Sequence, residues 1–73
     1  MPKVVLWKIQ YFNLFISKFG ERFRMPPDLA YRYIREHGGL DYLDMSYDYE
    51  HTQSLDSTIQ SVITVCRRNG GTL

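Results

Sequence analysis

The last third of the chain carries the pattern that most limits the fold, a set of apolar residues between two helix-terminating signals. Four apolar residues recur at the 4, 3, 4 spacing of one helical face: Leu55, Ile59, Val62 and Cys66. Ser54 precedes them as the expected N-cap, and Asn69-Gly70-Gly71 follows them as a C-terminal stop. The pattern therefore predicts a helix over residues 55–68, with Cys66 as a core residue.

A longer apolar pattern predicts a first helix over about residues 4–19. Five residues recur at helical spacing, and we expect them to face inward: Val5, Ile9, Phe12, Ile16 and Phe19. Gly20 follows as the expected helix stop. A second apolar set covers much of the other side: Trp7, Tyr11, Leu14 and Phe15. A surface helix needs only one apolar face, so this helix is either central in the fold or self-associates with a second chain.

Two shorter helices are predicted between these, at about residues 28–37 and 40–49. The first begins after Pro26-Pro27 and ends at Gly38, which we expect in the left-handed conformation. The expected inward residues are Leu29, Tyr33 and Ile34 on the first of these helices, and Leu40, Leu43 and Tyr47 on the second.

The sequence thus predicts an all-α fold, a compact bundle of four short helices in a single domain over residues 1–73. The predicted helices are at about 4–19, 28–37, 40–49 and 55–68. A chain of 73 residues buries a smaller fraction of its surface than a larger domain does, so its core contributes only a few kcal/mol of net stability. The lone Cys66 cannot form a disulfide within the chain, so we expect a protein partner or self-association to supply further stability.

Charge is divided along the chain into a basic first half and an acidic middle. Residues 36–66 contain six Asp or Glu and no Lys or Arg, whereas seven of the nine Lys and Arg lie within residues 1–35. A helix that reads DNA must approach the phosphate backbone, which repels an acidic helix. We therefore expect no nucleic-acid binding through residues 40–49. A DNA-binding autoregulator that uses the basic first half is an alternative.

The apolar N-terminal run is not expected to be a membrane or targeting segment. The run is interrupted by Lys8, Gln10 and Asn13. Its uninterrupted apolar stretches are therefore much shorter than the roughly 18 residues that a transmembrane helix needs. No small-residue cleavage site of a signal peptide follows it. We therefore expect no membrane partner and a cytoplasmic protein.

The stretch from His37 to Thr52 concentrates ionisable groups, as a metal or catalytic site would. Asp44, Asp48 and His51 share one face if a single helix continues to His51, and could then hold a divalent ion. However, the HExxH, EF-hand and paired Glu-x-x-His patterns are missing from the sequence. We expect no metal, no cofactor and no enzymatic activity. A small metal-dependent or catalytic protein centred on these three residues is the alternative.

The same stretch is rich in tyrosine, which combines an apolar ring with a polar hydroxyl and is enriched at protein interfaces. The predicted partner-binding residues are Tyr42, Asp44, Tyr47, Asp48 and His51. His51 is also expected to connect the helix end to the following cap through hydrogen bonds. If the last two helices run antiparallel, the Arg67-Arg68 pair is expected to face Asp44 or Asp48.

Residues 31–71 carry two distinctive elements, "HTQS" at 51–54 and "CRRNGG" at 66–71. With the "GG" helix end and the "DYL" helix before them, they resemble a family of short bacterial proteins catalogued as a domain of unknown function. The resemblance implies a small helical protein, often encoded beside an ADP-ribosyltransferase-like gene, and hence an antitoxin-like or accessory partner of a toxin. Its structural motif residues are Gly38, Gly39, Thr52, Ser54, Arg67 and Gly70. Thr52 and Ser54 would cap the last helix, and the glycines would permit positive φ.

Overall fold

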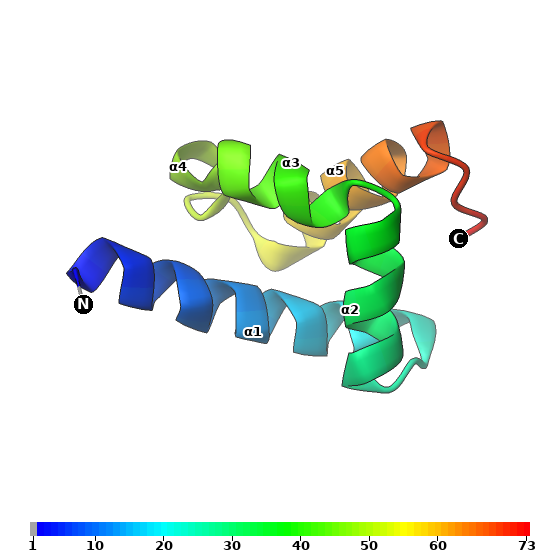
Figure 1. Ribbon diagram of the computed structural model, residues 1–73, viewed down its shortest axis with the longest axis horizontal. Coiled ribbons are helices and arrows are strands. Elements are labelled where there is room, and N and C mark those ends of the chain that lie inside the picture. The colour runs from blue at the N-terminus through cyan, green and yellow to red at the C-terminus, as the bar shows by residue number, and fades with distance from the viewer. Residues whose placement is uncertain (1) are drawn as a thin grey trace.

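The computed structural model describes residues 2–73, which form five helices and no strand and confirm the predicted all-α fold. The helices are α1 (Lys3–Phe23), α2 (Pro27–Glu36), α3 (Gly39–Met45), α4 (Tyr47–Glu50) and α5 (Leu55–Arg68). In Figure 1, α2 stands across the C-terminal end of α1, and α3 and α4 return above α1 toward its N-terminal half. α5 packs against α3 and α1. None of the helices within residues 2–73 has both the length and the apolar character needed to cross a membrane.

The core lies where α2, α3 and α5 meet the C-terminal half of α1. Its buried apolar residues are Phe15, Phe19, Ala30, Ile34, Leu43, Ile59, Val62, Ile63 and Cys66. The predicted stripe of α5 is therefore confirmed, apart from Leu55, which is half-buried. Ser54 is confirmed as the N-cap of α5, because its Oγ accepts the Ser57 N–H at 3.1 Å.

α1 is longer than predicted, and Gly20 does not end it. The helix continues to Phe23, and Arg24 adopts the left-handed conformation with φ of 56°. Gly20 is buried because the chain turns back over it, with the Met25 N–H donating to the Gly20 carbonyl at 2.8 Å. A Cβ at residue 20 would lie 2.6 Å from the Met25 carbonyl oxygen. Gly20 therefore permits a close approach of the chain and is not a helix stop.

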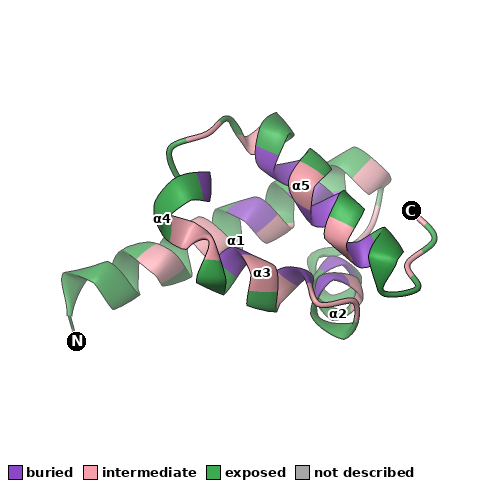
Figure 2. Ribbon diagram, turned by 90° about the horizontal axis from the view of Figure 1, so that it is seen from above, coloured by how far each residue is buried: buried purple, intermediate pink, exposed green. Residues whose placement is uncertain are grey.

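The inward face of α1 differs from the prediction in its N-terminal half. Phe12 and Ile16 pack against the core as expected, but Val5 and Ile9 are 43% and 44% exposed. Phe15, which the pattern placed on the opposite side, is fully buried. The first turns of α1 extend past the other helices and are mostly exposed (Figure 2). The helical spacing of Val5 and Ile9 is correct, but no element within residues 2–73 covers them.

α2 begins and ends as predicted, at Pro27 and before Gly38, which has φ of 77°. Its buried residues are Ala30 and Ile34, whereas Leu29, predicted to face inward, is 44% exposed. Leu29 is exposed because α2 packs closely on α1 through Ala30. A Cβ added at Gly20 of α1 would lie only 3.6 Å from the Ala30 Cβ of α2. This contact turns Ala30 toward α1 and Leu29 toward solvent.

The single helix predicted over residues 40–49 is two helices. Ser46, between α3 and α4, leaves the helical conformation with φ of −104° and ψ of 12°. The Ser46 carbonyl accepts a hydrogen bond from the Glu50 N–H at 2.8 Å, so the helical conformation resumes for one turn as α4. The break changes which side chains share a face, and therefore which of them can form a site.

Candidate functional site

The predicted partner-binding residues are divided by the fold between the interior and the surface. Tyr42 is half-buried on α3, and its hydroxyl donates a hydrogen bond to Glu50 Oε2. Its polar tip is therefore used within the protein. That Tyr42 contacts a partner stays a prediction, and any such contact would use the ring rather than the hydroxyl.

Glu50 is the residue that the sequence analysis missed. It is only 1% exposed, although it is one of the six acidic residues of the segment 36–66. Its Oε1 accepts a hydrogen bond from Thr58 Oγ1 at 3.2 Å, and Thr58 is itself fully buried on α5. The Tyr11 hydroxyl of α1 lies 3.5 Å from the Glu50 carbonyl oxygen. This network of Glu50, Tyr42, Thr58 and Tyr11 joins α4 to α3, α5 and α1.

The network alters the acid–base behaviour of its tyrosines. The hydrogen bond to Glu50, followed by burial, raises the pKa of Tyr42 above its usual value of 10.0. Burial also raises the pKa of Tyr11 above 10.0. Burial raises the pKa of the Cys66 thiol above 9.0, so this thiol is a poor nucleophile and acts as the predicted core residue.

We expect the protein to lose stability as the pH rises above about 9, because these three groups keep their protons more tightly when folded. Below 9.0 both states are protonated and the full stability is present. Above the unfolded pKa values, the unfolded state loses protons first, and stability falls until the folded pKa values are passed. Urea unfolding from pH 7 to pH 11 measures the effect, and Tyr42→Phe should make the fall less steep. A constant free energy of unfolding over this range would contradict the expectation.

Asp44 and Tyr47 mainly hold α3 and α4 against α1. Lys8 Nζ of α1 lies 2.5 Å from Asp44 Oδ1 and 5.4 Å from the centre of the Tyr47 ring. The Tyr47 ring also meets the Tyr11 ring edge to face, with their centres 5.6 Å apart. The prediction that Arg67 or Arg68 pairs with the acidic face is wrong: Asp44 pairs with Lys8 through Oδ1, and Arg67 Nε donates to the Leu73 carbonyl at 2.5 Å.

The remaining predicted residues stay at the surface, between α3 and the start of α5. His51 is exposed and its ring stacks on Tyr47 with centres 4.7 Å apart, rather than bridging to the following cap. Asp48 is exposed on α4. Two apolar neighbours are unusually exposed, Met45 at 87% and Tyr49 at 63%. We call Met45, Asp48, Tyr49 and His51 the α4 surface.

The motif residues around the helix ends have mainly structural contacts. Gly38 has the predicted positive φ, and beside it Asn69 Nδ2 donates to the His37 carbonyl at 3.1 Å. Gly39 does not have positive φ; a Cβ there would lie 2.7 Å from Ile34 Cγ2, so this glycine permits close packing. Gly70 has φ of 89°, as predicted.

Thr52 does not cap the last helix, contrary to the prediction. Its Oγ1 donates to the Tyr49 carbonyl at 2.6 Å, so it satisfies the end of α4. Of the two residues predicted to cap α5, only Ser54 does so.

The alternative of a metal centre at Asp44, Asp48 and His51 finds no support in this geometry. The break at Ser46 separates Asp44 from the one-turn helix that carries Asp48, and Asp44 is bound to Lys8. Within residues 2–73, no three His, Cys, Asp or Glu side chains are grouped as metal ligands would be.

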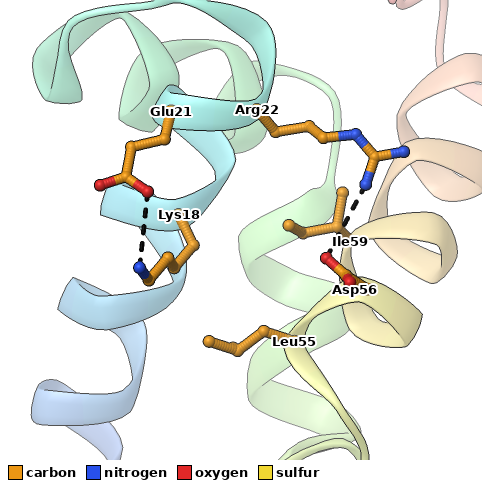
Figure 3. Close-up of a pocket in the computed structure, with 6 residues that line it drawn as sticks. All are labelled: Lys18, Glu21, Arg22, Leu55, Asp56 and Ile59. Carbon is orange, nitrogen blue, oxygen red and sulfur yellow. Dashed lines mark hydrogen bonds and ion pairs between the residues drawn. The ribbon is translucent and has the colours of Figure 1, made fainter.

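A separate pocket of about 280 Å³ lies between α1 and the start of α5 (Figure 3). Lys18 pairs with Glu21 at 3.5 Å, and Arg22 pairs with Asp56 at 3.9 Å, above the apolar side chain of Ile59. Both cations already have a carboxylate beside them, so the pocket has no unbalanced charge that would fix a ligand.

Comparison with known proteins places the chain in a family. A family model described as "Protein of unknown function (DUF3791)" matches residues 10–69. The chain belongs to this family. The DUF3791 match confirms the expected membership of a domain of unknown function, extends it from residue 31 to residue 10, and leaves the first turns of α1 outside. No curated protein and no solved structure matches the chain.

Proposed function

We propose that this DUF3791 protein is a non-catalytic interaction module that binds a protein partner through its α4 surface. The observation that carries the proposal is the exposure of Met45 and Tyr49, at 87% and 63%. Both lie in the segment 36–66, which has six acidic residues and no Lys or Arg. An apolar and aromatic centre with an acidic rim is suited to a basic protein surface.

The non-catalytic part of the proposal rests on how the ionisable groups are used. Glu50 is hydrogen-bonded to Tyr42 and Thr58 inside the protein, and Asp44 is paired with Lys8. Cys66 is buried in the core. These contacts engage three of the groups that a reaction could use as acid, base or nucleophile.

The partner that we propose is a toxin of the ADP-ribosyltransferase-like class encoded by a neighbouring gene, which this protein restrains in the cytoplasm. The support for this choice is the resemblance of the "HTQS" and "CRRNGG" elements to proteins with such neighbours. An acidic face on the restraining protein suits a cleft that binds a nucleotide, because such clefts carry positive charge for phosphate groups.

Co-expression with the product of the adjacent gene tests the proposal. We expect the two proteins to purify together and the growth defect caused by the neighbour to be relieved. Asp48→Arg and Tyr49→Ala should weaken the complex at least tenfold. Tyr31→Ala is the matched control, because Tyr31 is an exposed tyrosine on α2, at 41%.

Failure of the pair to associate, with no relief of the growth defect, would contradict the proposal. Equal weakening by Tyr31→Ala would contradict the choice of the α4 surface. Raising the salt concentration should weaken a complex that depends on opposite charges, so an affinity independent of salt would argue against the acidic rim.

A further inference from the structure

The first turns of α1 are apolar on every side. Successive residues of a helix are about 100° apart, so four consecutive residues surround the helix axis. Here these residues are Val4, Val5, Leu6 and Trp7. Each is between 43% and 55% exposed. A helix that is apolar all round is normally buried in a larger core. We call residues 3–9 the overhang.

A groove lies beside the overhang, between α1 and α3. It encloses about 300 Å³ and is lined by Val5, Lys8, Ile9, Phe12 and Asp44. Asp44 forms its rim: the carboxylate pairs with Lys8 of the same groove through Oδ1, but its side chain is 64% exposed and can meet a second cation. The groove is therefore an apolar trough with a carboxylate at one edge.

The overhang has the chemistry that this groove requires. Its charged residues are Lys3 and Lys8, and the first acidic residue of the chain is Glu21. One chain thus carries both an apolar helix that begins with the exposed cation Lys3 and an apolar groove edged by the exposed Asp44 carboxylate. A two-fold interface needs such a self-complementary surface, in which each copy supplies both halves.

We propose that two copies of the chain pair through α1, with the overhang of each lying antiparallel across the groove of the other. Antiparallel pairing separates the two Lys3 side chains and brings each toward the Asp44 rim of the other copy. It also covers the apolar side chains of the overhang that face the groove, Val5 and Ile9.

The exposed area is sufficient for a specific pair. Five large apolar side chains of α1 are about half exposed: Val4, Val5, Leu6, Trp7 and Ile9. Trp7 lies on the side of the helix away from the groove, but covering the other four together with the groove lining would remove roughly 500 Å² per copy from solvent, so two copies reach the roughly 1,000 Å² expected of a specific interface. The pairing would also increase the buried apolar surface of a chain whose own hydrophobic core is small.

This pairing is independent of the partner proposed above, because the α4 surface does not line the groove. A pair would present two α4 surfaces. Loss of pairing with retained binding of the neighbour-encoded protein, or the reverse, would separate the two proposals.

Light scattering and sedimentation equilibrium of the full chain, at about 1 to 100 µM, test the pairing. We expect a mass near twice 8.7 kDa at the upper concentrations. Ile9→Glu places a charge in the groove and should weaken association roughly 30-fold or more. Leu29→Glu is the matched control, because Leu29 and Ile9 are both 44% exposed, and it should leave association unchanged.

A monomeric mass across the whole range would overturn the proposal, as would an Ile9→Glu protein that associates like the wild type. Circular dichroism shows whether each variant keeps its helices. If Ile9→Glu unfolds, Lys3→Glu decides the question, since Lys3 is exposed at the first turn of α1. Weaker association of Lys3→Glu at low salt supports the pairing, and unchanged association contradicts it.

Discussion

Glu50→Ala is expected to lower the free energy of unfolding by about 3 kcal/mol, because it leaves a cavity in place of a buried side chain and removes the carboxylate that accepts two hydrogen bonds. The Tyr42 hydroxyl and the Thr58 hydroxyl both donate to the Glu50 carboxylate. Thr58 Oγ1 keeps the Ser54 carbonyl as an acceptor at 3.2 Å, so the lost hydrogen bonding falls mainly on the Tyr42 hydroxyl. Domains of this size have a net stability of only about 4 to 11 kcal/mol, so the variant should be substantially less stable. Urea unfolding followed by circular dichroism measures the change.

Two further variants distinguish hydrogen bonding from the loss of volume and charge. Glu50→Gln keeps the shape and one acceptor oxygen, so we expect a loss of only about 1 kcal/mol. Asp48→Ala removes an exposed carboxylate from the same helix and should change stability by less than about 0.5 kcal/mol. A Glu50→Ala protein as stable as Asp48→Ala would show that the buried network contributes nothing.

Glu50 also shows what the sequence can and cannot predict about the site. The apolar stripe Leu40, Leu43, Tyr47 continues at a spacing of three to Glu50, so the pattern already places this residue inward. The residue type argues against it, since carboxylates are rarely buried without partners. Its partners, Tyr42 and Thr58, are each eight residues away in sequence, and only the packing of α3 and α5 brings them together.

Which side chains of the site are exposed depends on the helix break at Ser46, and the sequence around Ser46 has no strong signal for a helix end. Ser46 carries neither the glycine nor the proline that usually ends a helix, so a continuous helix over residues 40–49 is the natural prediction. The break leaves Tyr42 and Tyr47 half-buried, while Met45 and Tyr49 are exposed. The tyrosine-rich character of the region is therefore predictable, but the choice of exposed residues is not.

Helix ends are predicted well where the residue itself determines the geometry. Ser54 caps α5 and Gly38 takes positive φ, because side-chain capping and left-handed backbone depend on near neighbours. The prediction fails where packing decides. Val5 and Ile9 have the right spacing for a core, but the rest of the chain does not extend over them.

Gly20 has the same sequence signal as Gly38 but an opposite role, and Gly20→Ala tests this role. Alanine is favoured over glycine inside a helix by about 1 kcal/mol, so a glycine that served only as a helix position should give a more stable variant. The added Cβ would instead lie 2.6 Å from the Met25 carbonyl oxygen. That carbonyl has little freedom to move, because the Met25 N–H is bound to the Gly20 carbonyl and Pro26, the N-cap of α2, follows directly after it.

We therefore expect Gly20→Ala to lower the free energy of unfolding by about 2 kcal/mol after the gain in helix propensity is included. Ser17→Ala is the control on the same helix, because Ser17 is exposed and its replacement should change stability by less than about 0.5 kcal/mol. Urea unfolding of both variants measures the difference. A more stable Gly20→Ala protein would mean that the chain can move away from α1 at Met25, and that the close contact between α1 and α2 does not depend on this glycine.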